Sequence, residues 1–372
     1  MAKLGEVCKL NMGQSPDSSS YNDTGDGIPF FQGNADFGEV HPNIRVWCNA
    51  PTKIAHPGEI LISVRAPIGA MNIADCECCI GRGLASISAD EAVCTTKYLW
   101  YGISSKIEEL NAKGTGSTFK AVNKKTLEET EIPIRDLMEQ ERIAARLDSV
   151  TALITLRKRQ VKKLDELVKA RFVEMFGEPV SNPLNWPTAE LGKRCEIITG
   201  NTPSRAEPEN YGTFIEWIKS DNINTPSTFL TEAQERLSEI GFQKCRFVES
   251  GSLLMTCIAG SLNCIGNVAV ANRRVAFNQQ INAVTPTHDN VLYLYWLMIL
   301  SKPTIHRTIN MALKGILSKS QLSLIKFPFP PLPLQNQFAA FVERVDQQKQ
   351  TVQQSLEKLE LMKKALMQEY FG

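Results

Sequence analysis

The sequence lacks long apolar runs. The longest uninterrupted one, Val291–Leu300, has ten residues, about half of what a helix needs to cross a bilayer, so we expect a buried helix there and no membrane partner. No apolar segment follows the first lysine, Lys3. This pattern indicates that there is no secretory signal and favours a cytoplasmic location.

Metal-binding patterns are scarce as well. Four histidines and ten cysteines are present, and the tightest cysteine cluster, at Cys76, Cys78 and Cys79, lacks the spacing that suits tetrahedral zinc. Without an export signal the cysteines are expected to stay reduced. We interpret them as small buried hydrophobic residues and expect no metal site.

An excess of positive charge is also missing. The chain has 41 basic and 40 acidic residues, a net charge of +1. A protein that grips nucleic-acid phosphates unaided normally carries a basic excess. If this chain binds DNA, much of its affinity for the backbone should come from a partner.

Two segments match part of a catalytic motif, but neither motif is complete. The segment Phe329–Leu332 has two prolines of an amino-methyltransferase box but not its flanking groups, and Gly33–Gly38 has phosphate-loop spacing with Glu39 and Val40 where Lys and Ser or Thr are needed. No other spacing nominates a catalytic site. We therefore expect a protein that is not an enzyme, with no catalytic residues and no cofactor of its own.

What the chain does have is an internal repeat. LGEVCKLNMGQSP, which starts at Leu4, recurs as LGKRCEIITGNTP at Leu191, an offset of 187 residues. Later the offset becomes 195, at which Gln140 matches Gln335. Two tandem copies of one unit, with loop insertions in the second, explain this pattern.

Each copy has the same plan. Short apolar runs broken by Gly, Pro, Asn and Asp come first and predict an α+β domain; a proline-marked hinge and one long helix follow. The predicted parts are a first domain at 1–136, a first long helix at 137–177, a second domain at 178–332 and a second long helix at 333–372.

Both predicted helices carry a heptad of apolar residues, which is typical of a coiled coil. A single stripe of this kind could equally pack on its own domain, but two matching stripes favour helices of about 50 Å that pair antiparallel and separate the two domains. The seam positions are Ile143, Leu147, Val150, Ile154, Val161, Leu164, Val168 and Met175 in the first helix and Phe338, Val342, Val345, Val352, Leu356, Leu359, Leu366 and Tyr370 in the second.

With this plan, the segments IPIRDLMEQERIAARLD at Ile132 and FPFPPLPLQNQFAAFVE at Phe327 resemble the specificity subunit of type I restriction-modification enzymes. The resemblance covers essentially the whole chain. Glu139-Gln140 fits the Glu-Gln pair common in that family, whereas the second copy has Leu334-Gln335, which puts the capping chemistry there in doubt.

The resemblance implies a prokaryotic, non-catalytic protein with two target-recognition domains, each reading one half of an asymmetric double-stranded DNA site. It also implies two methyltransferase subunits as partners, which would bind S-adenosylmethionine and methylate adenine, and restriction subunits with nuclease and translocase activity. Helices of this length would place the half-site centres about 15 base pairs apart. The alternative is a non-enzymatic coiled-coil adaptor that spaces two protein-binding domains.

Candidate DNA contacts are polar or basic residues in glycine-flanked loops, because Arg, Lys, Asn and Gln suit base edges in the major groove. Each of them could instead be a solvated loop residue or a turn residue that satisfies its own backbone. The candidates are Gln32, Asn34, Arg65, Arg82, Thr115, Ser117 and Lys120 in the first domain and Lys219, Asp221, Asn222, Ser261, Asn263, Gln279, Gln280 and Lys314 in the second.

Overall fold

The computed structural model describes residues 1–114, 120–309 and 315–372. Contacts divide the chain into unit 1, Met1–Lys158 with Gln354–Gly372, and unit 2, Arg159–Gln353. Each unit therefore contains one α+β domain and parts of both long helices. The predicted contacts Thr115, Ser117 and Lys314 lie outside the described residues.

Unit 1 is built on two main sheets. One has the strand order β2-β10-β7-β8 and the other β3-β5-β4-β9-β6, while β1 pairs with β11. The strands are β1 (Ala2–Lys3), β2 (Cys8–Met12), β3 (Tyr21–Asn22), β4 (Ile28–Phe31), β5 (Trp47–Cys48), β6 (Ile54–Ala55), β7 (Ile60–Ser63), β8 (Met71–Ile73), β9 (Cys78–Ile80), β10 (Leu84–Ala89) and β11 (Glu131–Ile132). The helices are α1 (Leu4–Val7), α2 (Thr96–Ser105), α3 (Ile107–Lys113) and α4 (Lys124–Glu128).

Unit 2 repeats this topology, except that its second sheet has four strands where that of unit 1 has five. Its sheets have the orders β13-β20-β17-β18 and β15-β14-β19-β16, and β12 pairs with β21. The strands are β12 (Thr188–Glu190), β13 (Cys195–Thr199), β14 (Tyr211–Ile218), β15 (Arg236–Leu237), β16 (Phe247–Val248), β17 (Ser252–Thr256), β18 (Val268–Ala271), β19 (Val275–Phe277), β20 (Ile281–Pro286) and β21 (Lys326–Pro328). The helices are α6 (Leu191–Arg194), α7 (Glu239–Gln243), α8 (Val291–Leu300), α9 (Lys302–Arg307) and α10 (Lys319–Leu324).

A capped helix with a tyrosine in its first turn connects the sheet to the long helix in both units. The side chains of Thr95 and Asn290 accept hydrogen bonds from backbone N–H groups at the starts of α2 and α8, which satisfies donors that a helix leaves open. Tyr98 and Tyr293 are fully buried, and each hydroxyl donates to a proline carbonyl oxygen before the long helix, at 2.9 and 2.8 Å. Helix α8 is the apolar run expected to be buried, and seven of its ten residues are.

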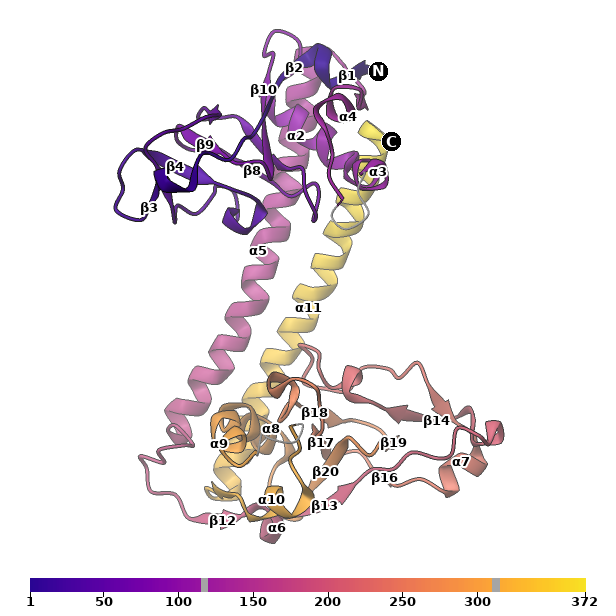
Figure 1. The fold of residues 1–372 in the computed structure, drawn as a ribbon. Coiled ribbons are helices and arrows are strands. Elements are labelled where there is room, and N and C mark those ends of the chain that lie inside the picture. Colours follow the sequence, from indigo (N-terminus) through magenta and orange to yellow (C-terminus); the bar gives the residue numbers. More distant parts are fainter. Residues whose placement is uncertain (115–119, 310–314) are drawn as a thin grey trace. The chain divides into compact units, whose positions relative to one another are not determined.

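The long helices are α5 (Leu137–Phe176) and α11 (Leu332–Phe371), labelled in Figure 1. Within each unit a part of α5 contacts a part of α11. In unit 1, Arg146 donates to the Tyr370 hydroxyl at 2.8 Å, and further along α5 Lys158 lies 2.9 Å from Glu360. From the first contact to the second, the residue number increases along α5 and decreases along α11. The pair is therefore antiparallel, as the sequence predicts.

The seam positions lie in the interior or at its border. The buried ones are Ile143, Leu147, Val150, Ile154, Val168, Phe338, Val342, Val345, Val352, Leu366 and Tyr370, and the half-buried ones are Val161, Leu164, Met175, Leu356 and Leu359. Additional aromatic residues face the domains: Phe172 stacks on Tyr293 at 5.5 Å, and Phe371 lies 4.9 Å from Tyr98. Each helix thus packs on its partner and on a domain. Both interpretations of the apolar stripes, pairing of the helices and packing on a domain, therefore apply.

The cysteines behave as small core residues. All ten are free thiols, and only Cys76 and Cys264 are not fully buried. Among the described residues, no three His, Cys, Asp or Glu side chains lie close enough to hold a metal ion. No helix within the same ranges is both long and apolar enough to cross a membrane.

Candidate nucleic-acid interface

Two parallel strands position the first set of predicted contacts. In unit 1, β4 and β9 pair in parallel, with Phe31 opposite Ile80, so the loops that follow them emerge at the same edge of the sheet. Gln32 lies in the first loop and Arg82 in the second, and both are exposed. A Cβ on Gly83 would lie 2.3 Å from the Gln32 carbonyl oxygen, so only glycine permits this approach of the two loops.

A third loop joins them. The Val64 N–H donates to the Gly83 carbonyl oxygen at 2.9 Å, and the Ala66 N–H donates to that of Lys120 at 3.1 Å. These bonds place the exposed residues Arg65 and Lys120 beside the first two loops. The four loop segments 32–36, 64–66, 81–83 and 120–122 form what we call the unit 1 loop edge. Asn34 also lies in it and is half-buried.

Unit 2 forms the same arrangement with different residues. Strands β14 and β19 pair in parallel, and the exposed Gln279 follows β19 as Lys219 follows β14. The Cys257 N–H donates to the Gln280 carbonyl oxygen at 2.8 Å, and the Leu317 N–H donates to that of Cys257 at 2.9 Å. The segments 219–224, 257–264, 278–280 and 315–317 form the unit 2 loop edge.

Of the remaining predicted contacts of unit 2, some have exposed side chains and one has a buried, hydrogen-bonded side chain. Asp221, Ser261 and Asn263 are exposed. Asn222 is 7% exposed, and its amide accepts from the Lys219 N–H and donates to the Glu232 carbonyl oxygen. Its side chain therefore stabilises the turn, which is the alternative interpretation of such residues, and it is not available at the surface.

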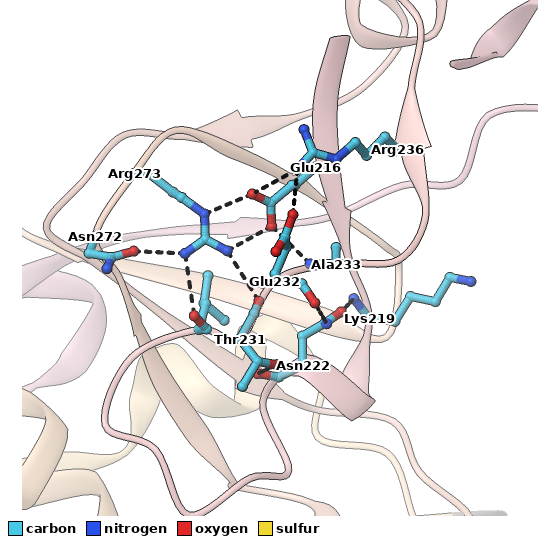
Figure 2. A network of polar contacts seen from close by, with 10 residues as sticks. Glu216, Lys219, Asn222, Thr231, Glu232, Ala233, Arg236, Asn272 and Arg273 are labelled. Atoms are coloured by element: carbon cyan, nitrogen blue, oxygen red, sulfur yellow. Dashed lines mark hydrogen bonds and ion pairs between the residues drawn. The ribbon is translucent and has the colours of Figure 1, made fainter. Parts of the chain in front are cut away.

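Arg273 ties the loop after β14 to the sheet (Figure 2). Its guanidinium donates to both oxygens of Glu216 at 2.9 and 2.7 Å, and to the carbonyl oxygens of Leu230 and Thr231 at 3.3 and 3.1 Å. The Arg273 guanidinium lowers the pKa of the Glu216 carboxyl group. Because Glu216 lies on β14, this fork fixes the segment that returns from Lys219 to the sheet.

A second ion cluster lies at the unit 2 loop edge. Glu235 receives two hydrogen bonds from Arg205, at 2.6 and 3.1 Å, and also pairs with Lys219. The Arg205 guanidinium lies 4.9 Å from the ring centre of Tyr211 and 5.6 Å from that of Trp217. Glu235 thus pairs with Lys219, which was predicted as a DNA contact from the sequence, and with Arg205, which was not predicted.

Sequence reasoning also missed two turns, which follow β2 in unit 1 and β13 in unit 2. The Gln14 N–H donates to the Ile80 carbonyl oxygen at 3.0 Å, the Arg82 N–H to the Ser15 hydroxyl at 3.3 Å, and Thr202 bonds to Gln279. Both turns therefore belong to the loop edges. The available signal was the repeat itself, because GQSP and GNTP end its best-matched segment.

Five of the buried thiols are poor candidates for nucleophilic chemistry. Burial raises the pKa of Cys257 to about 12, and it does the same for Cys8, Cys78, Cys94 and Cys195. A thiol with such a pKa stays protonated and is a poor nucleophile at neutral pH.

The fold and the two loop edges define a class: a duplicated α+β protein with paired long helices and a different polar surface in each copy. The family described as "Type I restriction modification DNA specificity domain" matches the chain over residues 1–166 and 183–361. The chain belongs to this family, whose described role is DNA specificity rather than catalysis.

Curated relatives agree. A candidate type I restriction enzyme MjaX specificity subunit from Methanocaldococcus jannaschii is 42% identical over 43% of this chain and 38% of its own length. The HindI specificity subunit of Haemophilus influenzae is 28% identical over 38% of this chain and 32% of its own length. These two matches span less than half of each relative. The EcoBI specificity subunit of Escherichia coli is 20% identical over 92% of this chain and 78% of its own length.

Solved structures share the fold. The S subunit of a type I restriction-modification system from M. genitalium superposes with a TM-score of 0.63 at 16% identity, covering all of this chain and 95% of the other. A chain from a study of complex assembly and conformational transition in the type I system gives 0.58 at 19% identity, covering 99% of this chain and 96% of the other.

Proposed function

We propose that this protein is the DNA-reading subunit of a type I restriction-modification complex, and that each loop edge reads one half of a bipartite site. The observation that carries the proposal is the pair of loop edges with the same backbone plan and different side chains. Gln32, Arg65 and Arg82 are exposed in unit 1, and Asp221 and Gln279 are exposed in unit 2. Different donors and acceptors select different bases, so the two half-sites should differ in sequence.

The charge of the chain is consistent with a reader that works inside a complex. Its net charge is +1, and Lys219 and Arg205 are already paired with Glu235. We propose that two methyltransferase subunits supply most of the phosphate contacts, carry S-adenosylmethionine and perform the methylation. Restriction subunits with nuclease and translocase activity would join that assembly.

Apolar side chains on the long helices offer docking positions for these partners. Leu156 and Leu361 are 54% and 67% exposed, and Leu153, Leu167 and Met362 are also exposed. Exposed apolar residues on a helix suit a protein partner. The same residues would serve the alternative, an adaptor that binds only proteins, so they do not separate the two functions.

A domain exchange separates them. Replacing residues 1–130 by those of a relative should change one half of the methylated motif and leave the other half intact, when methylated positions are mapped genome-wide with a co-expressed methyltransferase. The matched exchange of residues 178–325 should change the opposite half. If both halves changed together, the two units would not be independent readers. An adaptor would show no sequence-selective, salt-dependent DNA binding in the same preparation.

A further inference from the structure

Four lysines surround a pocket of about 590 Å³ in unit 1. The pocket lies where the turn between α2 and α3 meets the two long helices, and its floor is apolar, with Ile154, Met367 and Phe371. The lysines are Lys106, Lys158, Lys363 and Lys364, against two acidic residues, Glu108 and Glu360. The lining therefore carries a positive excess.

Lys363 is one of three lysines in this set that have no ion-pair partner among the described residues, together with Lys106 and Lys364. It is half-buried at a heptad position of α11, and burial together with the nearby charge of Lys158 lowers its pKa. Lys158 has a partner, Glu360, at 2.9 Å. Within the described ranges, no carboxylate lies within ion-pair distance of Lys363. A half-buried cation without a counter-charge is unfavourable, so the site favours an incoming anion.

The second repeat has an apolar residue at the position that corresponds to Lys363. At the repeat offset of 195, Lys363 corresponds to Val168, a buried core residue. The buried lysine of that unit, Lys349, lies 2.6 Å from Asp165 of the other helix. Unit 2 thus compensates its seam lysine internally, whereas unit 1 leaves Lys363 open to the pocket.

The pocket is connected to the unit 1 loop edge through α3. A Cβ on Gly69 would lie 2.6 Å from the Ile107 side chain, and the Asn111 amide donates to the Ile68 carbonyl oxygen at 3.0 Å. Helix α3 therefore packs directly on the loop that continues from Arg65. Lys106 is the residue before α3 and lines the pocket, so the pocket adjoins the helix that packs on this loop.

We propose that Lys106, Lys158, Lys363 and Lys364 bind a phosphate group, and that a backbone phosphate of the duplex read by unit 1 supplies it. The inference rests on the proposed DNA-reading function for the source of the phosphate, but not for the pocket's affinity for phosphate. Lysine ammonium groups act as point charges toward phosphate oxygens. Each phosphate neutralised by a protein cation releases counterions and steepens the salt dependence of binding.

The test compares Lys363→Gln and Lys364→Gln with Lys169→Gln. Lys169 is the exposed repeat counterpart of Lys364. It lines a pocket with two acidic residues, Glu166 and Glu174, so its substitution removes the same charge from a pocket that has no excess of lysine. With the full chain and a co-expressed methyltransferase, each pocket variant should lower the slope of log affinity against log salt by about 0.9, and should weaken specific and non-specific duplexes alike. Lys169→Gln should leave the slope unchanged.

A second arm titrates inorganic pyrophosphate into the same complexes without DNA and follows binding by calorimetry. Saturable binding that Lys363→Gln abolishes and Lys169→Gln preserves supports the pocket, whatever the DNA result. The pocket proposal is overturned if all three variants keep the wild-type salt slope and none alters pyrophosphate binding. If the wild-type complex also binds its duplex selectively, the DNA-reading function stands. If selective DNA binding is absent but pyrophosphate binding depends on Lys363, the function fails and the phosphate site survives with another source.

Discussion

Gln140 and Gln335 make two of their three hydrogen bonds with corresponding partners at the starts of the two long helices. Both side chains are fully buried. The Gln140 amide donates to the carbonyl oxygens of Val93 and Arg135 and accepts from the Thr95 N–H, all at 2.8 or 2.9 Å. The Gln335 amide donates to Pro330 and accepts from the corresponding backbone N–H, that of Asn290. One side chain in each copy thus connects a domain to its long helix.

Asp289 takes the place of Val93 in the second copy. The Gln335 amide donates to Asp289 at 2.8 Å, and Asp289 also receives two hydrogen bonds from Arg194, at 2.8 and 2.6 Å. The ion pair of Arg194 and Asp289 is thus attached to the start of the second long helix.

Gln140→Ala should destabilise the protein. The substitution leaves buried donors and acceptors at Thr95 and Val93 without partners, each at about 1–3 kcal/mol. We expect a loss of about 2–4 kcal/mol in the free energy of unfolding measured by chemical denaturation, on the same basis. Gln337→Ala, an exposed position near the start of α11, is the control and should change little; equal losses in both variants would contradict the linking role of Gln140.

Arg273→Lys should relax the DNA selectivity attributed to unit 2. Lysine keeps the charge but cannot form the two-pronged contact with Glu216, so the loop that begins at Lys219 should lose its fixed position. Methylome mapping should show degenerate bases in the unit 2 half-site and an intact unit 1 half-site. Arg274→Lys, whose partner is the exposed Glu249, is the matched control. A motif unchanged in both variants would mean that the Arg273 contact does not position the loop for reading.

Glu235→Gln should strengthen non-specific DNA binding. The carboxylate holds Arg205 and Lys219, and its removal would free two cations at the unit 2 loop edge. We expect tighter binding to unrelated duplexes at low salt. The slope of log affinity against log salt should become steeper by up to about 1.8, the value for two additional phosphate contacts. Glu232→Gln removes a nearby exposed carboxylate that pairs with Arg236 instead and should give a smaller change. Identical slopes in the two variants would show that Glu235 does not restrain these cations.

Asp346→Asn should stabilise unit 2 at neutral pH. Burial raises the pKa of Asp346, with further raising by Asp165 and Glu343 and an opposing effect of Lys349. An acid with a raised folded pKa binds protons more tightly when folded, so its contribution to stability is present at low pH and lost as pH rises through the folded pKa. The gain from Asn should be largest near pH 7 and should fade below about pH 4.

Denaturation curves from pH 3 to pH 8 measure this effect. Glu343→Gln, an exposed change on the same helix, is the control and should show a weaker pH dependence. A constant difference between Asp346→Asn and wild type at every pH would show that the effect comes from packing rather than from ionisation.

The sequence alone determined the architecture of each repeat. The match between the segments at Leu4 and Leu191 revealed the duplication, and the heptads revealed two long helices. These features depend on local spacing, since apolar residues at helical intervals and runs broken by glycine and proline reflect contacts between near neighbours along the chain. The family resemblance drew on another pair of repeated segments, at Ile132 and Phe327.

The tertiary structure decided which candidates share a surface and which are already occupied. Gln32 and Arg82 meet because β4 and β9 pair in parallel, and parallel pairing brings together segments that lie far apart in sequence. Asn222 and Lys219 look alike as polar loop residues, yet the first is buried in a turn and the second is paired with Glu235. A side chain's availability depends on partners that long-range packing supplies, and no local pattern in the sequence encodes them.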